Sequence, residues 1–186
     1  MRKLIEVTHV ALGGEVGTND WAFPYLEDEH NRYIRDLIET ADALVLGRKT
    51  YEGLSAAYPG MEAKANGVFL DFVHRMNTIK KYVATATLTE LAWNAEPIEG
   101  DFVDFVTALK QQPGGTIVKY GTGPLDKLLL ENRLVDEYHF LLAPVAVPSV
   151  TQHLFEDLDG NTALTLLGVT RFDSGVLLLR YAPPSR

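Results

Sequence analysis

The sequence contains no cysteine among its 186 residues. This absence excludes disulfide bonds, thiolate nucleophiles and zinc–thiolate centres. No apolar run approaches the roughly 18 residues that a membrane-spanning helix needs. The first residues, MRKLIE, also lack the long apolar segment of a signal peptide. We therefore expect an intracellular, cytoplasmic protein with no membrane partner.

Positive charge is also scarce. The sequence has 17 Lys and Arg residues against 25 Asp and Glu residues, which gives a net charge of −8. Such a chain has no general affinity for nucleic acids or anionic membranes. The five histidines show no metal-ligand spacing, so we expect no metal site. A length of 186 residues with 46% apolar residues suits a single domain that spans residues 1–186.

Apolar runs and helical periodicities alternate along the chain. Strands are expected at residues 3–12, 42–46, 81–87, 114–120, 135–145, 163–172 and 176–182. Helices are expected at residues 27–40, from about 49 until Pro59, and at 68–76, 101–111 and 124–134. Strands separated by helices predict a mostly parallel sheet covered on both faces, and the β-only ending adds antiparallel strands. Asp173–Gly175 is the expected hairpin turn.

Two adjacent cations open a predicted helix in the stretch VLGRKTYEG. The preceding strand meets Gly47, and Arg48, Lys49 and Thr50 follow. Cations at a helix N-terminus repel the helix dipole by a few tenths to about 1 kcal/mol. A bound phosphate would reverse this cost, since both the free amides and the side chains attract it. The alternative is a solvated pair of surface cations.

Two further strand ends could contact phosphate groups. In VKYGTGPLDKLL a strand enters the turn Gly121-Thr122-Gly123, where glycines allow close approach of a pyrophosphate to the next helix. In VATATL, Thr85 and Thr87 alternate at the end of a predicted strand. Ordinary turn geometry and the β-propensity of threonine are the alternatives. Ligands of open α/β sheets bind at such strand ends, and the paired cations favour the 2′-phosphate of NADPH.

Five stretches together carry a family resemblance, namely RKLIEVTHVALGG, ADALVLGRKTYEG, KYVATATL, LKQQPGGTIVKYGTGPL and RLVDEYHFLLAPV. The chain resembles the dihydrofolate reductase-like superfamily, in the branch similar to the reductase (C-terminal) domain of bifunctional riboflavin biosynthesis proteins. The resemblance implies a three-layer α/β/α fold with a central, mostly parallel sheet and an antiparallel C-terminal hairpin. It also implies an NADPH cofactor and a homodimer.

The resemblance assigns cofactor contacts in four groups. Residues for the adenosine side and phosphates are Gly47, Arg48, Lys49 and Thr50; those near the 2′-phosphate are Thr85 and Thr87; those around the pyrophosphate are Gly121, Thr122, Gly123 and Leu125; those in the loop near the nicotinamide are Gly13, Gly14, Val16 and Gly17. The implied function is an NADPH-dependent reductase of a small heterocycle. The substrate would be a dihydrofolate-like pterin or 5-amino-6-(5-phosphoribosylamino)uracil.

Such a reduction needs a proton donor, and the dihydrofolate reductases carry an acid early in the first helix. Glu27 and Asp28 are the corresponding catalytic candidates, with Glu29 beside them; acids that stabilise a helix dipole are the alternative. We expect His30 to lie at the surface. The Ser-Leu-Asp-Gly segment that is usual in the family is replaced here by residues 11–14, ALGG. This departure favours the alternative of a nucleotide-binding protein that has lost catalysis, and a third alternative is a dimeric domain that binds no nucleotide.

Overall fold

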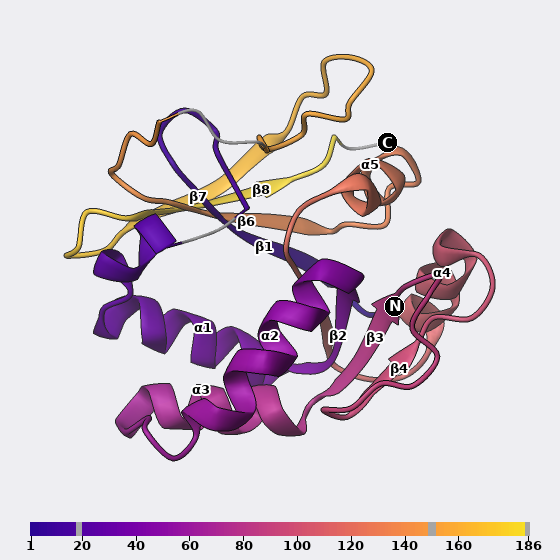
Figure 1. The fold of residues 1–186 in the computed structure, drawn as a ribbon. Coiled ribbons are helices and arrows are strands. Elements are labelled where there is room, and N and C mark those ends of the chain that lie inside the picture. Colours follow the sequence, from indigo (N-terminus) through magenta and orange to yellow (C-terminus); the bar gives the residue numbers. More distant parts are fainter. Residues whose placement is uncertain (18–19, 149–151, 185–186) are drawn as a thin grey trace. The chain divides into compact units, whose positions relative to one another are not determined.

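The computed structural model describes residues 1–17, 20–148 and 152–184. These residues form two compact units. Figure 1 labels their helices and strands. Unit 1 contains residues 1–3 and 31–120, and unit 2 contains residues 4–30 and those described between 121 and 186. Within this described part of the chain, no helix is both long enough and apolar enough to cross a membrane.

Unit 1 is a parallel α/β arrangement. Its strands are β2 (Ala41–Gly47), β3 (Lys80–Ala84), β4 (Ala95–Pro97) and β5 (Thr116–Tyr120). They lie in the order β4-β3-β2-β5, and every one of these neighbouring pairs is parallel. Three helices lie wholly in this unit, namely α2 (Arg48–Met61), α3 (Gly67–Thr78) and α4 (Phe102–Gln111). Helix α1 (Asp28–Thr40) begins in unit 2, and its residues from Asn31 onward belong to unit 1. Each strand and helix predicted for this region is present, but α2 and β3 end at other residues than predicted.

The centre of unit 1 is β2, which has parallel neighbours on both sides. Leu44, Val45 and Leu46 are each 0% exposed, as expected of a continuous apolar run in a parallel strand that is covered on both faces. The N-cap of α4 is Asp101, whose carboxylate accepts the amide hydrogens of Val103 and Asp104. An apolar run and an N-cap residue, both readable from the sequence, therefore account for the position of β2 and the start of α4.

Helix α2 continues past Pro59 to Met61, so the prediction that it ends before Pro59 is wrong. Proline removes only one helical hydrogen bond, and tertiary packing compensates for the loss. The Tyr58 ring makes an edge contact with Phe72 and stacks on Trp93. These contacts hold the last turn of α2 against α3 and the chain that precedes β4.

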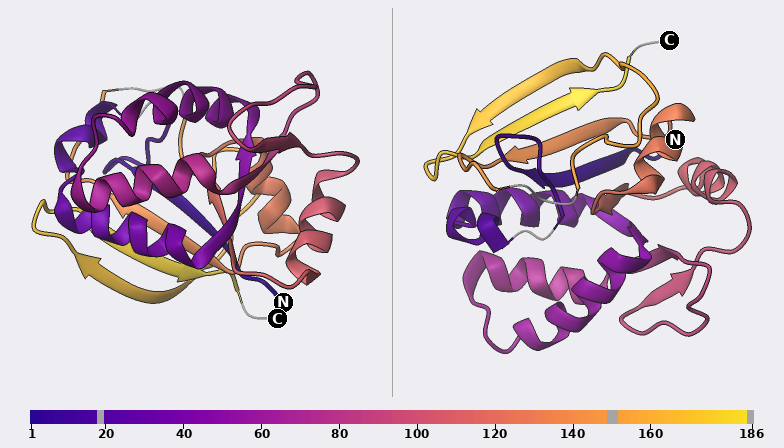
Figure 2. Two further views of the ribbon diagram at one scale, coloured as in Figure 1. Left: turned by 90° about the horizontal axis from the view of Figure 1, so that it is seen from below. Right: turned by 45° about the horizontal axis from the view of Figure 1, so that its top comes forward.

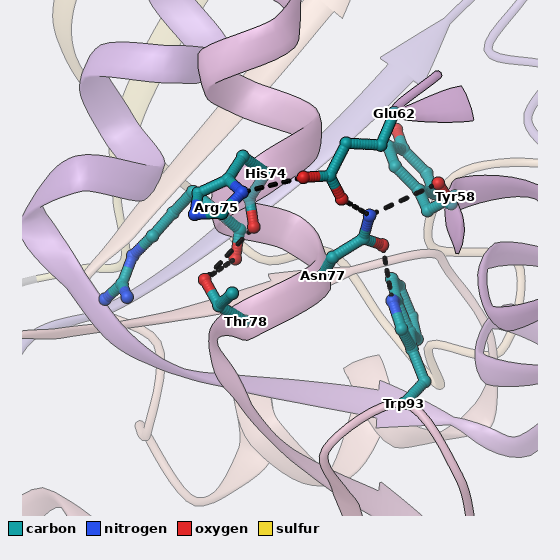
Figure 3. Close-up of polar contacts among 7 residues, drawn as sticks. All are labelled: Tyr58, Glu62, His74, Arg75, Asn77, Thr78 and Trp93. Atoms are coloured by element: carbon teal, nitrogen blue, oxygen red, sulfur yellow. Dashed lines mark hydrogen bonds and ion pairs between the residues drawn. The ribbon is translucent and has the colours of Figure 1, made fainter. Parts of the chain in front are cut away.

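A network of polar side chains reinforces this junction (Figure 3). The Asn77 amide nitrogen donates to the Glu62 carboxylate at 2.7 Å, and the Trp93 indole nitrogen donates to the Asn77 oxygen at 2.8 Å. His74 Nδ1 lies 2.8 Å from the other Glu62 oxygen. One asparagine thus links the end of α2 to the segment before β4.

Unit 2 combines one parallel strand pair with an antiparallel ending. Its elements are β1 (Leu4–Val10), the 3₁₀ helix η1 (Asp20–Tyr25), α5 (Pro124–Glu131), β6 (Glu137–Leu142), β7 (Thr165–Arg171) and β8 (Leu177–Ala182). The strand order is β1-β6-β8-β7, with β1 and β6 parallel and the other pairs antiparallel. Figure 2 shows the final two strands side by side in yellow tones. The C-terminal hairpin and the mixed, mostly parallel strand pairing are as predicted.

Helix α5 is shorter than the predicted 124–134. It ends at Glu131, and Arg133 has a positive φ of 53°, which turns the chain toward β6. Leu128 in the helix is 39% exposed, whereas Leu134 is buried beyond its end. The short strand β4 and the 3₁₀ helix η1 were not predicted, because neither has an apolar periodicity long enough to detect.

Candidate functional site

In unit 1, two of the predicted phosphate-binding segments share one sheet edge. The register pairs Gly47 at the end of β2 with Ala84 at the end of β3. Because the strands are parallel, the start of α2 and Thr85 follow their strands at the same edge. This is the edge of an α/β sheet at which ligands bind.

The start of α2 is suited to an anion. Arg48 and Lys49 are exposed, Thr50 is partly exposed, and no acidic residue lies in this fully described first turn. The free amides of the turn carry partial positive charge. Arg48 Nη1 lies 2.9 Å from Glu52 Oε1 in an exposed ion pair, which offsets part of the cationic charge. Cations and amides at one helix start fit a phosphate.

The alternation predicted for Thr85 and Thr87 within a strand is wrong, because β3 ends at Ala84. The Thr85 hydroxyl oxygen accepts the amide hydrogens of Thr87 and Leu88, at 3.2 and 3.1 Å. These local hydrogen bonds form a turn that competes with strand extension. The Thr85 hydroxyl proton can still be donated to an anion.

The loop after β1 carries the residues expected near a nicotinamide. Gly14 and Gly17 have φ values of +90° and +102°, which favour glycine. The Gly13 amide donates to the Glu15 carboxylate at 2.9 Å. Val16 is 2% exposed, so its side chain belongs to the core and only its backbone could face a ligand.

The turn before α5 contains the residues expected around a pyrophosphate. Gly121 has a φ of +80°, and Thr122 and Leu125 are partly exposed. The Gly123 amide donates to the Asp126 carboxylate at 3.0 Å, and Asp126 is 5% exposed. This helix start therefore already holds a negative group, and a pyrophosphate would need donors other than the Gly123 amide.

Sequence reasoning missed Gln152, which connects these two parts of unit 2. Its side-chain nitrogen donates to the Thr122 carbonyl at 3.1 Å, and its backbone carbonyl accepts the Val16 amide hydrogen at 3.1 Å. Its side-chain oxygen lies 3.5 Å from the position that a Cβ on Gly17 would occupy. No periodicity or motif marks this residue, so no local signal could have identified it.

Replacing Gln152 with alanine is expected to loosen the turn before α5. The variant loses one side-chain hydrogen bond, which is worth about 0.5–1.5 kcal/mol. Hydrogen exchange should become faster at Gly121–Gly123, while an exposed control, Gln111→Ala, should leave these amides unchanged. Unchanged exchange in Gln152→Ala would show that the turn keeps its conformation without this hydrogen bond.

The acids predicted as proton donors lie in solvent. Glu27 and Asp28 are both exposed, and Glu29 accepts the amide hydrogen of Asp173. The expectation that His30 lies at the surface is wrong, because His30 is 3% exposed. His30 Nε2 lies 3.0 Å from His9 Nε2 on β1. Their pairing across 21 positions of sequence explains why no local pattern indicated it.

Across residues 1–17, 20–148 and 152–184, no group of three or more His, Asp or Glu side chains is arranged to hold a metal ion. Both candidate regions offer backbone amides, and the first also offers hydroxyls and cations, beside the carboxylates of Glu15, Glu52 and Asp126. These groups suit phosphate and amide-bearing ligands.

Comparison with known proteins places these features in a family. The chain is 27% identical to the uncharacterized protein YyaP of Bacillus subtilis, over 90% of this chain and 86% of that protein. A pyrimidine reductase-like protein from Corynebacterium diphtheriae matches at a TM-score of 0.67 and 13% identity, over 100% of this chain and 93% of that chain.

Dihydrofolate reductase from Enterococcus faecalis, solved in complex with NADP(H), matches at a TM-score of 0.61 and 15% identity, over 98% of this chain and 97% of that chain. Identities this low show a shared fold alone, and they confirm the dihydrofolate reductase-like α/β fold. The model of the RibD C-terminal domain matches residues 2–178. Because this match covers nearly the whole chain, the protein belongs to the RibD C-terminal domain family.

Proposed function

We propose that this protein is an NADPH-dependent reductase of a small heterocyclic compound, either a dihydrofolate-like pterin or 5-amino-6-(5-phosphoribosylamino)uracil. The observation that carries this proposal is the sheet edge of unit 1. There Arg48 and Lys49 open α2 without a neighbouring acid in its first turn, next to the strand end that precedes Thr85. Membership of the RibD C-terminal domain family supports a reductase.

The residues present fit a phosphorylated dinucleotide. Arg48 and Lys49 would neutralise a 2′-phosphate, and the Thr85 hydroxyl would donate to it. The loop Gly13–Gly17 and the turn Gly121–Gly123 supply backbone groups on small residues, which allow close approach of a ligand. When bound, NADPH would supply the hydride, and the protein would orient the reactants and supply a proton.

Binding and turnover test the proposal separately. Calorimetry with NADPH and NADH should show binding that prefers NADPH, and absorbance assays with both substrates should show NADPH consumption. Binding without turnover would favour the second candidate, a nucleotide-binding protein without catalysis, which the exposure of Glu27 and Asp28 also favours. Absence of binding to either cofactor would overturn both.

We also propose that the protein acts as a cytoplasmic homodimer. Leu166, Leu167 and Val169 on β7 are 53%, 44% and 54% exposed, and β7 is the last strand in the order of unit 2. A long apolar edge strand of this kind is a site for pairing with another chain.

Introducing lysine at both Leu167 and Val169 is expected to give a monomer. In a dimer, the new lysines of one protomer would be buried opposite those of its partner, and their like charges would repel. Sedimentation velocity would measure the change. Phe23→Lys, at an apolar residue that is 66% exposed on η1, is the matched control and should leave the dimer intact. A wild-type protein that sediments as a monomer would contradict the proposal.

A further inference from the structure

The first turn of α2 starts without a side-chain cap. Its N-cap is Gly47, a residue with no side chain that could bind the first amides. Helix α4 differs, because the carboxylate of its N-cap Asp101 accepts the amide hydrogens of Val103 and Asp104. The amides that open α2 therefore stay available to a ligand, but a turn without a cap also tends to fray.

A tyrosine inside this turn supplies a different restraint. Tyr51 lies three residues after Arg48, in the first turn of α2, and is 6% exposed. Its hydroxyl oxygen accepts the Ala92 amide hydrogen at 2.9 Å, and the hydroxyl donates its own hydrogen to the Ala92 carbonyl oxygen at 3.3 Å. One side chain of the turn thus holds both backbone polar groups of a residue between β3 and β4.

Packing alone does not explain the hydroxyl of Tyr51. A phenylalanine would fill the same space without removing a hydroxyl group from water. Ala92 is exposed, so water could bind its backbone groups in place of the tyrosine. What the hydroxyl adds is a fixed position of the first turn of α2 relative to Ala92.

The chain that receives these hydrogen bonds is itself held in place. The residue after the bound alanine is Trp93, whose indole donates to Asn77 on α3 at 2.8 Å and stacks on Tyr58 (Figure 3). The side chain of Asn94 donates to the Thr78 carbonyl oxygen at 2.7 Å. Trp93 also has a φ of +60°, which a bulky residue adopts only where surrounding contacts impose it. The phenol hydroxyl therefore ties the turn to a fixed point.

Two tyrosines of α2 contact this fixed point in different ways. Tyr51 and Tyr58 lie seven residues apart, or about two helical turns, so they face the same side of the helix. Tyr58 contacts Trp93 through its ring, whereas Tyr51 contacts Ala92 through its hydroxyl. Removing a hydroxyl should therefore matter at position 51 and not at position 58.

We infer that Tyr51 is a positioning residue for the cofactor. Its hydroxyl holds the uncapped first turn of α2 so that the free amides, together with Arg48 and Lys49, meet the 2′-phosphate of NADPH. This role rests on the proposed function. A capping carboxylate would also order the turn, but it would occupy the amides and repel the phosphate. A tyrosine bound to a neighbouring segment orders the turn and leaves its amides open.

Replacing Tyr51 with phenylalanine is expected to raise the Kd for NADPH about 3- to 10-fold, the scale of one lost hydrogen bond. The Kd for NADH should change by less than about twofold, because NADH lacks the 2′-phosphate. Calorimetric titrations measure both values. A general loss of stability would weaken both cofactors alike, so the preference for NADPH separates positioning from a merely structural role. Tyr58→Phe is the matched control and should retain the wild-type preference.

Two further measurements test whether Tyr51 acts through the phosphate-binding turn. In a chain that carries Arg48→Ala and Lys49→Ala, Tyr51→Phe should weaken NADPH binding by a smaller factor than in the wild type, whereas independent effects would multiply. In the wild type, NADPH should slow hydrogen exchange at the Ala92 amide, because coupling between two sites is reciprocal. Exchange at Ala92 that NADPH leaves unchanged would overturn the inference, even if Tyr51→Phe fails to fold.

The outcomes for the wild type and the variant separate this role from the proposed function. A wild type that binds neither NADPH nor NADH overturns the proposed function and the role of Tyr51 with it. A wild type that prefers NADPH, with the same preference in Tyr51→Phe, overturns only the role of Tyr51. An equal factor for Tyr51→Phe with and without the two cations would likewise contradict positioning of Arg48 and Lys49.

Discussion

Replacing both Arg48 and Lys49 with alanine is expected to weaken NADPH binding about 5- to 150-fold, or about 1–3 kcal/mol. The two exposed cations open α2 beside its free amides, and this combination attracts a phosphate more strongly than either component alone. NADH lacks the 2′-phosphate, so its binding should change by less than about threefold if the cations contact that group. Calorimetric titrations of the variant and the wild type with both cofactors measure the difference.

A matched control removes a charge elsewhere in unit 1. Lys64 is exposed in the turn after α2, and Lys64→Ala should leave the preference for NADPH unchanged. The unfolding temperatures of both variants should stay close to that of the wild type, because exposed cations contribute little stability. Equal weakening of NADPH and NADH by the double substitution would contradict the 2′-phosphate role and place the cations at another phosphate.

The parts of the fold that sequence predicted are those governed by local patterns. The run Leu44–Leu46 is fully buried in a strand with parallel neighbours on both sides, as its unbroken apolar character indicated. The turn Asp173–Gly175 joins two antiparallel strands, and Gly175 has the positive φ of +88° that such a turn needs. The apolar character of neighbouring residues decides the first feature, and the backbone freedom of one glycine decides the second.

The features that sequence missed depend on partners far along the chain. Pro59 lies inside α2 because Tyr58 packs on Phe72 and Trp93, which follow in later elements. His30 is buried because His9 accepts or donates its hydrogen bond, and Gln152 contacts two glycine-rich segments that are distant in sequence. Local propensity is too weak to oppose such contacts, and a single sequence does not reveal them.

Lys81 on β3 is another buried residue that the sequence did not indicate. Its side chain is fully buried, with Nζ 4.0 Å from the centroid of the Trp93 ring and 2.8 Å from the Ile79 carbonyl oxygen. Asn77 and Tyr58 hold the Trp93 ring in this position (Figure 3). Burial lowers the pKa of Lys81 to about 7, and the charge of Arg75 acts in the same direction.

This lowered pKa makes stability depend on pH. In the unfolded chain Lys81 keeps its ordinary pKa of 10.5, so below about pH 7 both states are protonated and the folded state carries the full cost of the buried charge. From about pH 7 to 10.5 the folded state releases the proton while the unfolded state keeps it. Stability therefore rises with pH across this window, by about 1.4 kcal/mol per pH unit at most.

Lys81→Met, which keeps the length and removes the charge, is expected to exceed the wild type in stability at pH 6. The difference in free energy of unfolding should shrink by about 2–3 kcal/mol between pH 6 and pH 9, since the wild type sheds its buried charge over that range. Urea denaturation at the two pH values measures this change. The exposed control Lys64→Met shows how much of it comes from the loss of any one positive charge. A constant difference between Lys81→Met and the wild type would show that Lys81 stays charged, with the Trp93 ring and the Ile79 carbonyl compensating for its burial.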